Sequence, residues 1–184
     1  MLKVGITGNI ASGKSQVENI IKKLGYIVFD LDIISHKLLE NNSDVKALIL
    51  KEFNTLDRKI IGNIIFNNKE KKEKLEKIIH PKLKEFCINE FNKDNKVVFI
   101  SGALLYESSF DSLFDKIIYV DANKDLRIER LIKRNNLTKE EALLRINSQQ
   151  NNNSKADFII ENNSDLNKLE AKVNSILHEL ICNK

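Results

Sequence analysis

The most informative stretch of the chain is Gly8-Asn9-Ile10-Ala11-Ser12-Gly13-Lys14-Ser15. It satisfies the pattern G-x-x-x-x-G-K-[ST] at every position. Glycines let such a loop wrap so that successive backbone N–H groups point at phosphate oxygens, and the helix that follows adds its positive N-terminal end. Lys14 would reach the β- and γ-phosphates, and Ser15 would offer a hydroxyl to Mg²⁺. All eight residues are therefore predicted to bind the phosphates of a nucleotide, with Ser15 also a metal ligand.

The segments around this motif supply the context that it requires. An apolar run, Leu2–Thr7, reads as a buried strand, and a helix is expected from Lys14 to Leu24. Gly25 then stops the helix, and Tyr26–Phe29 forms a second apolar strand. The order strand, loop, helix, strand is a βαβ unit, which implies a parallel sheet.

Three later apolar runs complete an α/β fold with five parallel strands. They are Val97–Ile100, Lys116–Val120 and Phe158–Ile160. The pattern predicts helices throughout the long segment after the second strand, with breaks at 42–44, at 54–57 and at Pro81. It predicts two short charged helices, Asn123–Arg134 and Thr138–Gln149, before the last strand, and a closing helix, Asp165–Ile181. Ligands of such sheets bind at the carboxyl ends of the strands.

Two carboxylates and a histidine follow the second strand. If Asp30–Asp32 is extended, Asp30 and Asp32 point the same way, and His36 lies one helical turn beyond. A carboxylate beside the γ-phosphate can accept the proton of an attacking hydroxyl or help to hold Mg²⁺ through water. Asp32 is therefore a predicted catalytic residue. Asp30 is a candidate substrate contact that could instead cap a helix, and for His36 a structural role and a substrate contact are equally open.

The arginines form a third candidate set. Arg127, Arg130 and Arg134 share one helical face, and Arg145 lies on the next helix. Arginines neutralise charge on a transferring phosphoryl group, often from a mobile lid. Arg134 and Arg145 bracket the turn where a lid would close, and both are predicted to be catalytic. A solvated helix face is the alternative for all four.

Composition narrows the class of protein. The chain has 184 residues, 42% hydrophobic and 30% charged, which suits one α/β core. No apolar run approaches the roughly 20 residues of a spanning helix, so we expect a cytoplasmic protein with no membrane partner. The net charge is only +4, and the densest lysine cluster, within 69–77, alternates with glutamates and lacks aromatic residues, so no nucleic-acid partner is expected. Cys87 and Cys182 are expected to be free thiols.

The motif Gly8–Ser15 is a phosphate-binding loop, or P-loop. Two classes of protein that carry such a loop, GTPases and nucleic-acid-associated ATPases, fit the rest of the sequence poorly. GTPases read guanine with N-K-x-D, whereas the carboxylate in Asn123-Lys124-Asp125-Leu126 comes one residue too early. A nucleic-acid-associated ATPase would carry an acid at the end of an apolar strand, and the run Val97–Ile100 ends in Ser101 instead. A nucleoside or nucleoside-monophosphate kinase on the same scaffold stays open.

Seven segments in order resemble motifs of the dephospho-CoA kinase family. They are Gly5–Ser15 (G-[IL]-T-G-x-I-x-S-G-K-S), Asp30–His36 (D-x-D-x-x-x-H), Asp57–Phe66 (D-R-x-x-L…V-F), Leu75–Pro81 (L-E-x-I-x-H-P), 104–107 (P-L-L-F-E), Arg145–Gln149 (R-[IM]-x-x-Q) and Ala156–Asn162 (A-D-x-V-I-x-N). Ala103, where the family usually has proline, and Ile61, where it has leucine, depart from these patterns but stay apolar.

The resemblance implies ATP-dependent phosphorylation of the ribose 3′-hydroxyl of dephospho-CoA, the last step of coenzyme A biosynthesis. It makes ATP and dephospho-CoA the small-molecule partners, with Mg²⁺ as the metal. Asp32 would be the base or would orient the hydroxyl, Arg58 and His80 would contact the acceptor, and Asn162 would lie near adenine.

The resemblance also implies one nucleotide-kinase-like domain, 1–184, in a monomer or small homo-oligomer. Its core would comprise 1–31, 96–124 and 154–184, with a helical CoA-binding insert at 32–95 and a lid at 125–153.

Overall fold

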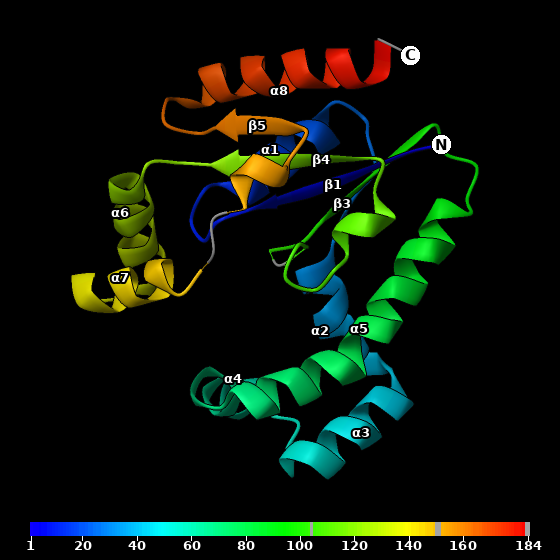
Figure 1. Ribbon diagram of the computed structural model, residues 1–184, viewed down its shortest axis with the longest axis vertical. Coiled ribbons are helices and arrows are strands. Elements are labelled where there is room, and N and C mark those ends of the chain that lie inside the picture. Colours follow the sequence, from blue (N-terminus) through cyan, green and yellow to red (C-terminus); the bar gives the residue numbers. More distant parts are fainter. Residues whose placement is uncertain (104, 150–151, 183–184) are drawn as a thin grey trace. The chain divides into compact units, whose positions relative to one another are not determined.

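The computed structural model describes residues 1–103, 105–149 and 152–182. The elements in chain order are β1 (Leu2–Gly8), α1 (Lys14–Lys23), β2 (Val28–Asp30), α2 (Leu31–Asn41), α3 (Ser43–Phe53), α4 (Arg58–Asn67), α5 (Lys69–Phe91), β3 (Val97–Ser101), η1 (Asp111–Leu113), β4 (Lys116–Asp121), α6 (Lys124–Asn135), α7 (Lys139–Asn147), η2 (Asn153–Lys155), β5 (Phe158–Glu161) and α8 (Leu166–Cys182). The chain divides into two compact units. We call Met1–Phe29 with Asn95–Lys184 the sheet unit, and Asp30–Asp94 the helical unit (Figure 1).

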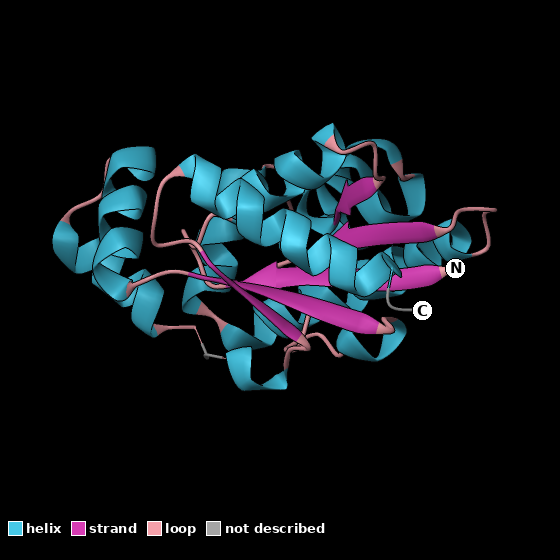
Figure 2. Ribbon diagram, turned by 90° about the horizontal axis from the view of Figure 1, so that it is seen from above, coloured by secondary structure: helices cyan, strands magenta, loops and turns pink. Residues whose placement is uncertain are grey.

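The sheet has five strands in the order β2-β3-β1-β4-β5. Figure 2 shows the strands of the sheet side by side, in magenta. β1 pairs in parallel with β3 and β4, and β4 pairs in parallel with β5. In this register Ile6 lies opposite Ser101, and Gly8 lies opposite Val120. The carboxyl ends of β1, β3 and β4 therefore share one edge of the sheet. The predicted α/β fold with five strands is confirmed.

α1 and α8 pack on one face of the sheet, in a core that also draws on β1, β3, β4 and β5 (Figure 1). Val17, Ile20 and Ile21 are buried at helical spacing on α1. The helix ends as predicted at Gly25, whose φ is 88°. The Gly25 N–H donates to the Lys22 carbonyl, and the Tyr26 N–H donates to the Ile21 carbonyl, which together satisfy the last carbonyls of the helix.

The helical unit has its own core of Val45, Ile49, Phe53 and Ile61. Asn or Asp side chains cap the N-terminus of every helix in it, from Asp30 at α2, Asn42 at α3, Asp57 at α4 and Asn68 at α5. These short polar side chains supply acceptors to backbone N–H groups that lack intrahelical partners.

One expected break in the helical unit is wrong. α5 runs unbroken from Lys69 to Phe91 with Pro81 inside it. Proline has no N–H, so the helix continues at the loss of one backbone hydrogen bond at that turn.

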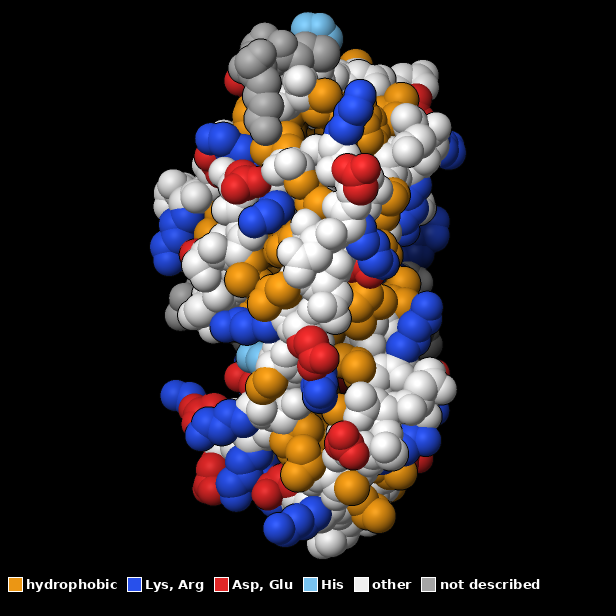
Figure 3. Space-filling model, turned by 90° about the vertical axis from the view of Figure 1, so that its right-hand side faces the viewer, with side chains coloured by type: hydrophobic (Ala, Val, Ile, Leu, Met, Phe, Trp, Pro, Cys, Tyr) orange, Lys and Arg blue, Asp and Glu red, His pale blue; other side chains and the backbone are white. Residues whose placement is uncertain are grey.

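The surface of the helical unit carries both acidic and basic side chains. Lysines pair with glutamates along α5, as in Lys72–Glu76 and Lys82–Glu85, and Figure 3 shows acidic and basic side chains intermixed there.

Cys87 is a buried free thiol whose pKa burial raises to about 12, so it stays protonated. Among the described residues, no helix has the length and apolar character needed to cross a bilayer.

Candidate active site

The P-loop, Gly8–Ser15, connects the end of β1 to the start of α1. Ala11 and Gly13 adopt left-handed backbone conformations, with φ of 61° and 98°. A Cβ on Gly13 would lie 2.0 Å from Nδ2 of Asn162, and one on Gly8 would lie 2.2 Å from the carbonyl oxygen of Val120. Both motif glycines are thus required by the groups packed against the loop.

Two residues far along the chain donate hydrogen bonds to the backbone of this loop. The Asn162 amide, just after β5, donates to the Ser12 carbonyl at 2.9 Å and to Gln16 Oε1 at 3.1 Å. The Arg130 guanidinium, on α6, donates to the carbonyl oxygens of Ser12 at 3.2 Å and of Asn162 at 2.9 Å. Arg130 therefore points into the molecule, so the alternative of a solvated helix face is wrong for it.

Asn162 is 2% exposed, and the contacts of its amide are with the P-loop and Gln16. Its expected position near adenine stays a prediction.

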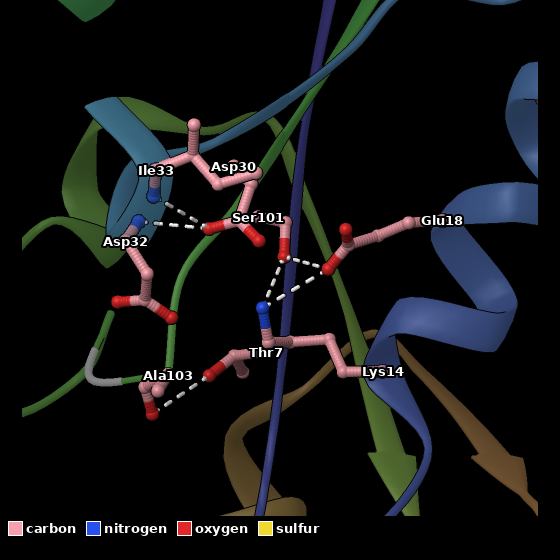
Figure 4. A network of polar contacts seen from close by, with 8 residues as sticks. All are labelled: Thr7, Lys14, Glu18, Asp30, Asp32, Ile33, Ser101 and Ala103. Carbon is pink, nitrogen blue, oxygen red and sulfur yellow. Dashed lines mark hydrogen bonds and ion pairs between the residues drawn. The ribbon is translucent and has the colours of Figure 1, made fainter. Parts of the chain in front are cut away.

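Lys14 lies in a compact network with Glu18 and Ser101 (Figure 4). Its Nζ is 3.0 Å from Glu18 Oε1 and 2.7 Å from Ser101 Oγ. The Ser101 hydroxyl in turn donates to Glu18 Oε1 at 2.6 Å. The ammonium that a P-loop directs at phosphate is thus held by a buried carboxylate and a hydroxyl at the end of β3.

α6 and α7 pack on each other and on the apolar side chains of the P-loop, Ile10 and Ala11. Gln149, just after α7, accepts from the Ile10 N–H at 2.6 Å. Beside these residues lies a pocket of about 420 Å³, lined by Asn9, Asp121, Ala122, Lys124, Arg127, Ile146, Asn147 and Gln149.

Arg127 is buried at this pocket, and its Nε has no hydrogen-bond partner within the described part of the chain. It is the second of the four arginines for which a solvated helix face is wrong.

A smaller pocket is lined by Gly8 and includes Tyr106 and Tyr119. Burial raises the pKa of both tyrosines to about 12, so both hydroxyls stay protonated at neutral pH. The Tyr106 hydroxyl is buried without a partner among the residues that the structure describes. Glu107, also at this pocket, accepts from the Asn152 amide at 3.2 Å.

The two arginines predicted to be catalytic are both exposed. Arg134 lies in the last turn of α6 and donates from Nε to Oδ1 of Asn135 at 2.9 Å. Arg145 lies in the last turn of α7. Their predicted roles stay predictions.

In the helical unit, the expectation of an extended Asp30–Asp32 segment is wrong. Asp30 is the N-cap of α2, and its Oδ1 accepts from the backbone N–H groups of Asp32 and Ile33 (Figure 4). Asp32 therefore lies in the first helical turn, where its side chain is exposed. The capping role that was open for Asp30 is the one that the structure shows, and a substrate contact stays a prediction.

The residues expected to contact the acceptor lie on three helices of this unit. Arg58, the first residue of α4, approaches His36 on α2, with its Nη2 2.6 Å from Nε2 of the imidazole. Since arginine can only donate, His36 accepts through Nε2. His80 lies on α5, and burial lowers its pKa, with the Lys84 charge acting in the same direction against the attraction of Glu76.

The family model described as dephospho-CoA kinase matches residues 2–168. The chain belongs to the dephospho-CoA kinase family. A dephospho-CoA kinase of Listeria innocua is 42% identical, with 98% of both chains covered. One from Fusobacterium nucleatum is 39% identical over 92% of this chain and 94% of its own.

Solved structures agree with this assignment. Dephospho-CoA kinase from Campylobacter jejuni is 32% identical and superposes with a TM-score of 0.71 over 98% of both chains. TT1252 from Thermus thermophilus is 31% identical, with a TM-score of 0.82 over 97% of both chains. A shikimate kinase from Bacteroides thetaiotaomicron, 17% identical with a TM-score of 0.60 over 97% of both chains, shares the fold.

Membership of the dephospho-CoA kinase family confirms the predicted reaction class. The protein is a kinase that transfers a phosphoryl group from ATP to an alcohol, in the last step of coenzyme A biosynthesis. The structure adds two residues that the sequence reasoning missed at this site, Glu18 and Ser101, and it shows that Arg130, a member of the candidate arginine set, contacts the backbone of the P-loop. Only the spacing of four between Lys14 and Glu18 was visible beforehand as a signal.

Proposed function

We propose that the sheet unit binds ATP through the P-loop, and that the helical unit carries the residues that recognise dephospho-CoA. The observation that carries this proposal is a complete P-loop whose lysine is already held at the carboxyl edge of the sheet. Lys14 would bind the β- and γ-phosphates, while the backbone N–H groups of the loop bind the remaining phosphate oxygens.

Mg²⁺ fits the residues present at the start of α1. Among the described residues, no three or more His, Cys, Asp or Glu side chains gather into a metal cage. Magnesium in nucleotide sites is instead held by few protein oxygens, by waters and by the phosphates themselves, and the exposed Ser15 hydroxyl suits that role. When bound, the ion would neutralise charge on the phosphates.

On the acceptor side, Asp32 would orient the ribose 3′-hydroxyl and take its proton. Its side chain is exposed in the first turn of α2, and a carboxylate can act as a general base. The pair of His36 and Arg58 would bind an anionic part of dephospho-CoA, because the guanidinium keeps donors beyond the one that it gives to His36. His80, neutral at pH 7 because of its lowered pKa, would bind as an uncharged imidazole.

Arg134 and Arg145 would approach the γ-phosphate when nucleotide is bound. Both lie near the ends of helices that pack on the P-loop, and their exposed guanidinium groups are available for charge stabilisation. The lid at 125–153, which includes residues 150–151 outside the described part, stays a prediction. So do the single domain, the cytoplasm as compartment and the monomer or small homo-oligomer.

The reaction is tested by ADP release from ATP·Mg²⁺ with dephospho-CoA, AMP, CMP, dTMP or a simple nucleoside as acceptor. We expect turnover with dephospho-CoA alone. Turnover with a nucleotide instead would favour the rival, a nucleoside-monophosphate kinase on the same scaffold.

The role of Asp32 is tested by Asp32→Asn in the same assay. Loss of the proton acceptor should lower kcat by about 10²–10⁴-fold while ATP binding is unchanged. A variant that keeps more than half of the wild-type kcat would show that Asp32 is not the base.

A further inference from the structure

The buried carboxylate of Glu18 has no part in the reaction as described so far. Glu18 is 3% exposed and lies on α1 one turn after Lys14. The residues beside it on the helix, Val17, Ile20 and Ile21, are buried in the apolar core. A buried glutamate costs free energy unless it is paired, and even a paired one is seldom more stabilising than an apolar side chain of similar size. Folding alone therefore gives little reason for a carboxylate at this position.

The partners of Glu18 connect it to the reaction. Oε1 accepts from the Lys14 ammonium at 3.0 Å and from the Ser101 hydroxyl at 2.6 Å. The Ser101 oxygen also accepts from Lys14 at 2.7 Å, so its single proton goes to Glu18 and its lone pair goes to Lys14. The three groups form a closed triangle that uses two of the three N–H donors of the Lys14 ammonium and the single proton of the Ser101 hydroxyl, which leaves one ammonium donor for a ligand.

The carboxylate of Glu18 lies beside the end of β3, the strand next to β1. Many P-loop proteins place an acid at the end of the strand next to β1, close to the lysine and the metal. Here that strand, β3, ends in the buried Ser101, and the carboxylate comes from α1 instead. The helix supplies the negative charge that the strand lacks.

We propose that Glu18 is a positioning residue, which with Ser101 holds the Lys14 ammonium in line for the β- and γ-phosphates. This inference rests on the proposed role of Lys14 in binding those phosphates. The ammonium has four single-bond rotations between it and the backbone, and the triangle limits it to one direction before ATP arrives. Such alignment affects the transition state more than ground-state binding, because displacements of an ångström can cost about 10²-fold in rate.

The test compares Glu18→Gln and Ser101→Ala with the wild type. Gln keeps the shape of the side chain and one carbonyl acceptor but removes the charge. We expect kcat to fall about 10–100-fold in Glu18→Gln, less than the loss of a direct oxyanion donor. ATP and ADP affinity, measured by calorimetry without acceptor, should stay within about threefold, because removing a carboxylate near an anionic triphosphate offsets the looser ammonium. Ser101→Ala should show a smaller change in the same direction.

A matched control is Glu90→Gln, since Glu90 is also a buried glutamate paired with a lysine, Lys93, which lies just beyond the end of α5. Its kcat and its ATP affinity should equal those of the wild type. The proposal is overturned if Glu18→Gln keeps kcat within twofold. It is equally overturned if nucleotide affinity and melting temperature fall together, since Glu18 would then only support the fold. The comparison uses whichever acceptor the wild-type protein phosphorylates, so a failure of dephospho-CoA would count against the proposed function alone.

Discussion

At the scale of single residues, the phosphate-binding loop depends on side chains outside its motif. Arg130 donates to the carbonyl oxygen of Ser12 in the loop and to that of Asn162, just after β5. Asn162 itself donates to Ser12. The planar guanidinium reaches the two acceptors from separate nitrogens, Nη1 for Ser12 and Nη2 for Asn162, whereas a lysine would have to reach both from one nitrogen.

We therefore expect Arg130→Lys to weaken ATP binding although the charge is kept. Each lost hydrogen bond to a charged donor is worth about 1.5–3 kcal/mol, so the Kd for ATP should rise by about tenfold or more. Calorimetric titration with ATP·Mg²⁺ measures this change. Lys133→Ala, an exposed position on the same helix, is the control and should bind ATP as the wild type does. Equal affinity of Arg130→Lys and wild type would show that the fork geometry is not needed.

At the scale of elements, an aspartate secures the docking of β5 beside β4. Asp157 accepts from Lys116 Nζ at 2.7 Å and from the Ile117 N–H at 2.8 Å, while its own N–H donates to the Ile117 carbonyl at 3.0 Å. Burial alone would raise the pKa of this carboxyl, but the hydrogen bonds from Lys116 and Ile117 outweigh it and lower the pKa. Asp157 belongs to the A-D-x-V-I-x-N segment, so this part of the family resemblance has a structural role here.

A lowered pKa in the folded state makes stability depend on pH with a definite sign. The contribution of Asp157 is fully present above its ordinary pKa of about 3.9, and it is lost as pH falls through the lower, folded value. Asp157→Asn should cost about 1–2 kcal/mol in the free energy of unfolding at pH 7 and less at pH 3, which lies below the ordinary pKa of the carboxyl. Urea denaturation at both pH values measures this. A cost that is the same at both would show that the charge of Asp157 contributes nothing.

At the scale of the whole molecule, the features that could be predicted from the sequence are those set by local patterns of residues. The strands, the P-loop and the end of α1 at Gly25 follow from apolar runs and glycine chemistry that act over a few residues. The start of α2 was missed although Asp30 carried a capping signal, because an extended reading of Asp30–Asp32 was preferred. Arg130 and Asn162 meet the P-loop across more than a hundred residues, and Glu18 meets Ser101 across 83. Only the parallel topology brings such pairs together, so no local pattern could have predicted them.

The division of the molecule into two units predicts which helices each substrate protects from hydrogen exchange. The sheet unit and the helical unit have separate apolar cores, so each can open locally with its own free energy. A ligand stabilises the part that binds it, by about 2.7 kcal/mol at a hundred times its Kd. Hydrogen exchange read by mass spectrometry should therefore slow in the P-loop, α1 and α6 when ATP·Mg²⁺ is added. Dephospho-CoA alone should slow exchange in α2, α4 and α5, where Asp32, Arg58 and His80 lie. If dephospho-CoA protected only peptides of the sheet unit, these residues would not form the acceptor site, and the helical unit would need another role.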